Sequence, residues 1–126
     1  MADLKESGIT KLAGPITIGM QTTDGIQTLY TVPVGKSCIV TYVIACIPTA
    51  SLADGVDYDL GDGVAADTWL QTVNLTTMTA TTDYMVIESN NIKHTVFNAG
   101  DVFAIKPIIG STADADASIY VFGFLF

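Results

Sequence analysis

The stretch Leu29–Pro48, LYTVPVGKSCIVTYVIACIP, decides the fold. It predicts the end of one strand, a turn at Pro33-Val34-Gly35, and then a long strand over Lys36–Ile47. This second strand contains no Gly, Pro, Asn or Asp and is rich in Val, Ile, Thr and Tyr, which are residues that favour β-structure. We therefore expect the rest of the chain to be arranged around it.

Both faces of this long strand are apolar. Because side chains alternate along a strand, one face is predicted to carry Cys38, Val40, Tyr42, Ile44 and Cys46, and the other Ile39, Thr41, Val43, Ala45 and Ile47. A strand of this kind belongs inside a sandwich, with its second face covered by a loop or by another subunit. Replacing Tyr42 or Ile44 with Asp is accordingly expected to abolish folding.

The two cysteines share one predicted face but cannot pair with each other. Cys38 and Cys46 are eight residues apart, roughly 26 Å along a straight strand, whereas a disulfide needs Cα atoms within about 7 Å. We expect two free, buried thiols.

Further strands follow at short intervals, each bounded by turn residues. They are expected at 15–21, 26–32, 56–60, 84–88, 92–97, 102–106 and 117–126, while 68–75 fits either a strand or a short helix. Eight or nine short strands without a sustained helical period predict an all-β protein, an antiparallel β-sandwich of jelly-roll-like kind. Residues 1–14 are interpreted as an extended N-terminal arm, and residues 15–126 as the sandwich domain.

The composition argues against several classes of partner. The 126-residue chain has five lysines, no arginine and a formal net charge of −8. Proteins that bind nucleic acid need clustered cations for the phosphates, so no nucleic-acid partner is expected. The acidic body also argues against anionic membranes, and no apolar run reaches the ~18 residues of a membrane helix.

An acidic cluster is the one candidate for a metal site. Asp54, Asp57, Asp59 and Asp62 lie close together between glycines, and oxygen ligands at tight turns are what Ca²⁺ uses. The same residues are also explained as the solvent face of a strand flanked by Asp-Gly turns, and the acid that a calcium loop would need is replaced by Thr68. We expect no metal, with calcium as the weaker alternative, and no cofactor.

Catalytic and sugar-binding arrangements are the remaining options. His94 is the single histidine and is expected at the surface or an interface rather than in a catalytic dyad. Trp69, Tyr58, Tyr84 and Tyr120 could form a platform for sugars, but aromatic side chains in a sandwich are more often core. No enzyme activity is expected.

Two stretches resemble a known group of proteins. Leu29–Lys36, followed by the long strand and Ala50-Ser51-Leu52, is similar to a segment of small virion proteins of tailed bacteriophages. Ala99–Phe103 and the last strand, ending Phe122-Gly123-Phe124, resemble the same group, whose members are capsid decoration (cement) or head-accessory proteins.

The resemblance implies a structural virion protein that binds the outside of the capsid and stabilises the shell by bridging capsomers. It also implies synthesis in the host cytoplasm, a homotrimer, and the major capsid protein as partner. A tail or head-fibre module that binds host-surface glycans, with Trp69 exposed in a groove, is the alternative. The interface candidates are the apolar residues of the arm and of the last strand, namely Leu4, Ile9, Leu12, Tyr120, Phe122, Phe124 and Phe126.

Overall fold

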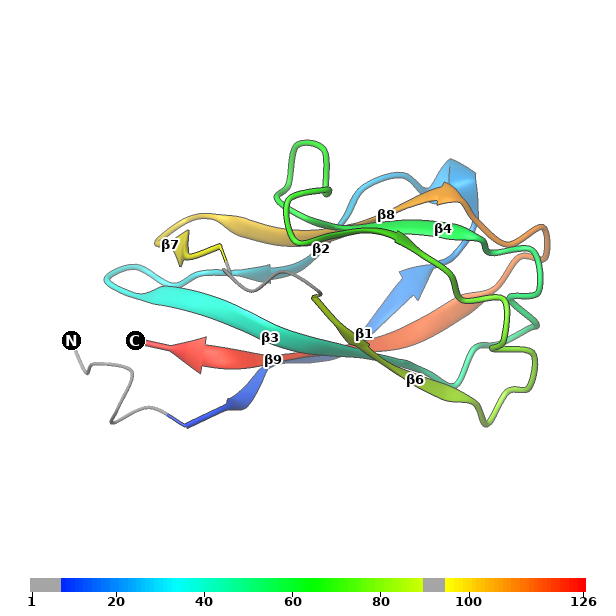
Figure 1. Ribbon diagram of the computed structural model, residues 1–126, viewed down its shortest axis with the longest axis horizontal. Helices are drawn as coiled ribbons and strands as arrows, with labels where there is room; N and C mark the ends of the chain where they lie inside the picture. Colours follow the sequence, from blue (N-terminus) through cyan, green and yellow to red (C-terminus); the bar gives the residue numbers. More distant parts are fainter. Residues whose placement is uncertain (1–7, 90–94) are drawn as a thin grey trace.

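The long strand expected after Lys36 is present as β3 (Ser37–Cys46), and it lies at the centre of one of two facing sheets (Figure 1). The structure is a computed structural model that describes residues 8–89 and 95–126. Within these residues nine strands form the two sheets. The other strands are β1 (Thr10–Gly19), β2 (Gln27–Thr31), β4 (Asp57–Gly61), β5 (Leu70–Val73), β6 (Tyr84–Glu88), β7 (Phe97–Asn98), β8 (Val102–Ile109) and β9 (Asp116–Leu125), with a 3₁₀ turn η1 (Thr22–Asp24) between β1 and β2.

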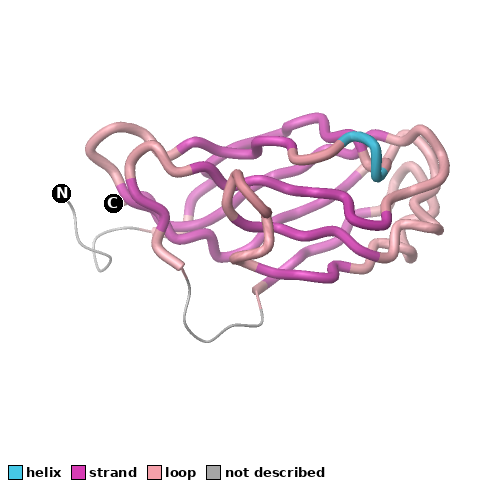
Figure 2. Tube along the Cα trace, turned by 90° about the horizontal axis from the view of Figure 1, so that it is seen from above, coloured by secondary structure: helices cyan, strands magenta, loops and turns pink. Residues whose placement is uncertain are grey.

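Every strand pairing is antiparallel, so the predicted all-β sandwich is confirmed. The first sheet, called sheet A here, has the order β1-β9-β3-β6, with β7 also paired to β3. The second, sheet B, has the order β2-β8-β4-β5. Figure 2 shows the strands of both layers running along the long axis of the molecule, with loops gathered at the two ends. The jelly-roll connectivity stays a prediction.

Several segments refine the sequence-based expectation, among them β8, which continues to Ile109 rather than ending at Lys106. β1 begins at Thr10 and pairs with β9 from there on, so residues 10–14 of the expected arm belong to a strand. The segment 68–75, which fitted a strand or a helix, contains the strand β5. The strand expected at 92–97 falls largely outside the described residues, and Phe97 begins the short β7.

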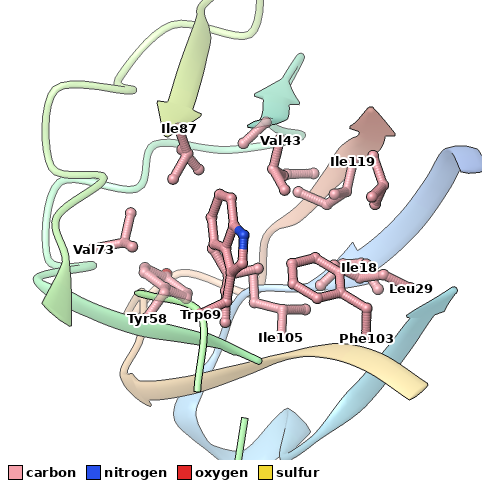
Figure 3. Packing of buried hydrophobic residues seen from close by; sticks show 14 of the residues in the cluster. Ile18, Leu29, Val43, Tyr58, Trp69, Val73, Ile87, Phe103, Ile105 and Ile119 are labelled. Carbon is pink, nitrogen blue, oxygen red and sulfur yellow. The ribbon is translucent and has the colours of Figure 1, made fainter. Parts of the chain in front are cut away.

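The core between the sheets is built around large aromatic side chains (Figure 3). The ring of Phe103 meets those of Trp69 and Phe97 edge-on, at centroid distances of 5.5 and 5.6 Å. Trp69 Nε1 donates to the Val40 carbonyl at 3.0 Å, and the Tyr58 hydroxyl donates to the Met20 carbonyl at 2.8 Å. Both polar tips are therefore satisfied although the rings are buried.

A β-bulge in β3 overturns the predicted alternation of its faces. Val40 is paired with Gly123 of β9, but the next pair is Tyr42 with Phe122, so β3 has one extra residue here. The extra residue is Thr41, whose Oγ1 donates to the Phe122 carbonyl at 3.0 Å. As a result the buried residues of β3 are Cys38, Val40, Val43 and Ala45. The assignment of Tyr42 and Ile44 to the same face as Val40 is wrong.

The bulge also separates the two cysteines. Cys38 is buried in the core, whereas Cys46 lies half-buried on the opposite face of the strand. The expectation that they share a face is wrong, but both thiols are free, as predicted. Burial, assisted by the charge of Asp101, raises the pKa of Cys38 to about 11. Burial also raises the pKa of Cys46, so both thiols stay protonated near neutral pH and are weak nucleophiles.

Candidate functional site

The outward side of sheet A is an apolar surface, which we call the outer face. It consists of the side chains that alternate with the core residues of three adjacent strands. They are Tyr120, Phe122 and Phe124 from β9, Ile39, Tyr42 and Ile44 from β3, and Tyr84 and Val86 from β6. The β9 and β3 members are half-buried, while Tyr84 at the edge is 73% exposed.

The outer face is organised in rows across the sheet. One row runs from Lys11 in β1 through Phe122 and Tyr42 to Glu88 in β6, as the strand register shows. The Tyr42 and Phe122 rings stack, with centroids 4.8 Å apart and planes 13° from parallel. Directly opposed residues share a face, so the cation, the two rings and the anion all lie on the outside.

The neighbouring rows extend the same apolar surface. Tyr120, Ile44 and Val86 are register partners in the next row, and Phe124 pairs with Ile39 on the other side. Lys11 Nζ lies 5.9 Å from the centre of the Tyr120 ring. Contiguous apolar surface of this kind, rimmed by charges, is typical of a contact surface for another macromolecule.

The outward side of sheet B has the opposite character. Asp57 and Asp59 of β4 alternate with the buried residues Tyr58 and Leu60, so both carboxylates point outward. Asp59 is the register partner of Lys106 in β8. The two large faces of the sandwich therefore differ: the outer face is apolar, whereas the outward side of sheet B carries charged side chains on β4 and β8.

A second exposed apolar region lies at one end of the sandwich, which we call the terminal end. The turn between β2 and β3 projects there with Val34 95% exposed, and Ile9, next to β1, is 53% exposed. The last residue, Phe126, closes this end by exchanging two backbone hydrogen bonds with Ser37, at 2.7 and 2.9 Å. In Figure 1 the C-terminus, β7 and the β2–β3 turn are seen at the same end.

The seven predicted interface residues divide between these two surfaces. The structure brings Tyr120, Phe122 and Phe124 together on the outer face. Ile9 and Phe126 lie at the terminal end, Leu12 packs partly against the core, and Leu4 lies outside the described residues. Tyr42 and Ile44 belong to the outer face as well but were missed, because the bulge that turns them outward is set by the pairing of β3 with β9.

Three of the four acidic residues considered for calcium, Asp54, Asp59 and Asp62, accept hydrogen bonds from backbone or hydroxyl groups. Asp62 Oδ1 accepts the backbone N–H groups of Val64, Ala65 and Ala66 at 3.0, 3.0 and 3.3 Å. These bonds hold the pKa of Asp62 below its ordinary value. Among the described residues, no group of three or more acids, histidines or cysteines could hold a metal ion.

Of the other three acids of that cluster, Asp57 and Asp59 are neighbours and Asp54 lies apart from them. Asp54 accepts a hydrogen bond from the Thr112 hydroxyl, and Asp59 Oδ1 accepts the Thr72 N–H at 2.9 Å. Asp57 Oδ1 is buried without a hydrogen-bond partner. Burial, followed by the charge of Asp59 and a hydrogen bond with it, raises the pKa of Asp57.

The prediction that aromatic residues of the sandwich are core holds for Trp69 and Tyr58, and the alternative of an exposed groove at Trp69 is not observed. Trp69 is 2% exposed and Tyr58 is fully buried, so both belong to the core and cannot stack on a sugar. Of the four aromatic residues considered, Tyr84 and Tyr120 reach the surface, and both lie on the outer face. No observation therefore favours the glycan-binding alternative.

A cleft of about 560 Å³ lies between the loop that follows β4 and the segment before β8. Asp62 and Asp101 are among its lining residues, but both are structural: Asp62 holds its own loop, and Asp101 Oδ2 accepts the Asn98 N–H at 2.8 Å. His94 lies outside the described residues. Within the described ranges, no helix is long and apolar enough to cross a membrane.

Comparison with known proteins gives fold-level similarity. No protein-family model and no curated protein sequence matches this chain. The fold is similar to a chain in the capsid asymmetric unit of cyanophage Pam1, with a TM-score of 0.60 and 17% identity over 94% of this chain and 84% of that one. It is also similar to a chain in the acidic stable capsid structure of Helicobacter pylori bacteriophage KHP30, with a TM-score of 0.56 and 11% identity over 93% of each chain. Both matched chains are thus close to this one in length.

Proposed function

We propose that this chain is a structural protein of a bacteriophage virion, which binds the outside of the capsid and stabilises the shell by bridging capsomers. The observation that carries the proposal is the similarity of fold, over nearly the full length, to chains of similar size in two phage capsids. The stretches around Leu29–Lys36 and Phe122–Phe124, which resemble decoration proteins, support the same assignment.

The exposed apolar surfaces are those expected of a protein whose function is to bind other proteins. Burying apolar surface contributes roughly 25 cal/mol per Å², and this chain offers two apolar regions, the outer face and the terminal end. A subunit of a bridging assembly needs one surface for a neighbouring subunit and another for the shell. The two apolar regions of this chain can divide these roles.

The charge of the chain supports a position outside the shell. A formal charge of −8 without any arginine repels the phosphates of a packaged genome. The outward carboxylates of β4 would then face water. Sheet B is therefore the face we expect to point away from neighbouring proteins.

The terminal end is our candidate for the contact with the shell. Val34 is almost fully exposed on a turn that is held by the Lys36 N–H donating to the Pro33 carbonyl at 3.2 Å, with Gly35 in the left-handed region at φ +77°. A side chain on a fixed turn loses little conformational freedom when it enters a pocket, which favours binding. Ile9 adds apolar surface nearby.

The test is binding of the purified chain to capsids of the phage that encodes it, prepared without this protein. Co-sedimentation with expanded shells is expected, with little binding to immature shells. Val34→Asp should weaken binding about tenfold or more, because a charge would be desolvated in the contact.

Val56→Asp is the matched control, since Val56 is also exposed but lies just before β4, at the opposite end of the sandwich, where its N–H donates to the Ile109 carbonyl. It should bind like the unmodified protein. If the folded chain binds neither type of shell, the proposed function is wrong. If both valine variants bind equally well, the terminal end is not the contact.

A further inference from the structure

The row across the outer face that contains Lys11, Phe122, Tyr42 and Glu88 has a specific symmetry. Its two ends carry opposite charges, on β1 and β6, and its two middle positions carry stacked rings, on β9 and β3. Lys11 and Glu88 are both exposed. If the row is placed opposite a second copy of itself in reverse order, each charged residue meets a residue of opposite charge and each aromatic ring meets another ring.

We propose that the outer face binds a second copy of this chain around a two-fold axis that runs along the strands, between β9 and β3. Such an axis reverses the order of the four strands and leaves positions along them unchanged. Lys11 then faces the Glu88 of the second copy, and Phe122 faces its Tyr42, each contact occurring twice. Isologous contacts of this type are the commonest way in which proteins form dimers.

The remaining rows are compatible with the same axis. Phe124 would face Ile39, and Tyr120 would face Ile44, so apolar residues meet apolar residues in each case. The carboxylates Asp57 and Asp59 lie on sheet B and stay outside the contact. Charge complementarity thus selects the pairing, and apolar area supplies the affinity.

The dimensions of the face correspond to a contact at the small end of the range of specific interfaces. Four strands about 4.8 Å apart, of which the central two are about 33 Å long, cover a footprint on the order of 500 Å². A standard protein interface buries roughly 800 Å² of accessible surface on each partner. Packed sheets lie about 10 Å apart, a gap that an extended lysine and an extended glutamate can bridge.

Taken with the proposed function, on which this step rests, the orientation of the two copies determines how the pair meets the shell. An axis parallel to the strands leaves both terminal ends pointing in the same direction. A pair would then present two Val34 turns side by side to one shell. Each pair would hold two points of the shell, as a bridge between capsomers requires.

The decisive experiment is a charge swap, followed by sedimentation velocity of the purified protein at low salt. The unmodified chain is expected to form dimers. Lys11→Glu and Glu88→Lys should each weaken the dimer about tenfold or more, because two like-charged pairs replace two attractive ones. The double variant Lys11→Glu/Glu88→Lys should recover most of the lost affinity, because the pairs are restored in reverse.

Two charge reversals away from the outer face serve as controls. Lys36→Glu, on the β2–β3 turn, and Asp114→Lys, on the loop before β9, are both exposed and should leave the dimer unchanged. Circular dichroism should show that all variants are folded. A monomer, a trimer such as the resemblance implies, or a double variant no better than the single ones would overturn the proposal.

Failure of this proposal and failure of the proposed function are distinguishable. Self-association is measured without any shell, and shell binding is measured by co-sedimentation. A chain that binds expanded shells but stays monomeric contradicts only the pairing, whereas a dimer that binds no shell contradicts only the function.

Discussion

At the scale of single residues, Gly123 explains the most about sheet A. It lies in β9 opposite Val40, where a side chain at this position would run into the backbone carbonyl of Ile39. The neighbouring pair is shifted by the bulge at Thr41. The absence of a Cβ at Gly123 therefore permits the close approach of β9 to β3 beside the bulge, and with it the outward position of Tyr42.

Gly123→Ala is expected to lower the free energy of unfolding by about 2 kcal/mol or more, because a methyl group forced against backbone must displace one of the central strands. Urea unfolding measures the change. Gly8→Ala is the matched control, because an added Cβ there meets nothing within 4 Å. Equal stability of the two variants would contradict the close approach.

Asp57 gives a pH-dependent prediction. Its folded-state pKa is raised, mainly by burial and then by Asp59, so the ionised form is disfavoured in the fold. The resulting cost is absent below the ordinary aspartate pKa of about 3.9, grows as the pH rises through the folded-state pKa, and is fully present at neutral pH. The protein should thus lose this part of its stability on going from acid to neutral pH.

Asp57→Asn is expected to raise the free energy of unfolding at pH 7 by about 0.5 kcal/mol, a value kept small because the site is partly open to water. The gain should vanish near pH 3, where Asp57 of the unmodified protein is protonated. Urea unfolding at both pH values measures it, and Asp114→Asn on an exposed loop is the control. A gain of the same size at pH 3 would show that charge is not the cause.

At the scale of elements, β3 shows how one inserted residue changes the role of a strand. Up to Val40 the sequence alternation and the structure agree, and beyond Thr41 they are out of phase by one. Both halves of the strand are apolar on both sides, so hydrophobicity does not reveal the shift. The bulge turns Val43 and Ala45 into core residues and frees Tyr42 and Ile44 for the outer face.

The expectation that Tyr42→Asp or Ile44→Asp abolishes folding is revised accordingly. Val43→Asp should leave the protein unfolded, because it places an unpaired charge in a fully buried position. Ile44→Asp, one residue further on the half-buried side, should stay folded and lose self-association instead. Circular dichroism and sedimentation velocity on the two variants check this, and an unfolded Ile44→Asp would contradict the assignment of the faces.

At the scale of the whole molecule, the sandwich has two unlike faces and two ends, both of which expose apolar side chains, with Val34 at the terminal end and Ile47 and Ile109 at the other. The outer face of sheet A carries stacked aromatic rings, the outward side of sheet B carries the carboxylates of β4, and the terminal end carries Val34. The two faces of the molecule are therefore not equivalent as contact surfaces. In the proposals made above, the outer face pairs with a second copy, sheet B stays in water and the terminal end contacts the shell.

The sequence by itself determined the fold class, the central position of the Leu29–Pro48 stretch, and the need to cover its second face. These follow from residue type and spacing, which are local properties. It also predicted Tyr120, Phe122 and Phe124 as interface candidates, because the last strand is apolar on both sides, and the structure places all three on the outer face.

Only the tertiary structure decided which side chains of β3 point outward, that Trp69 is core, and that Lys11 and Glu88 lie at opposite ends of one row. The bulge lies where β3 passes close to Gly123, a residue about 80 positions away in the chain, and the row exists through pairings among four strands. Register between distant strands depends on how they pack against one another, and no pattern within a single segment contains that information.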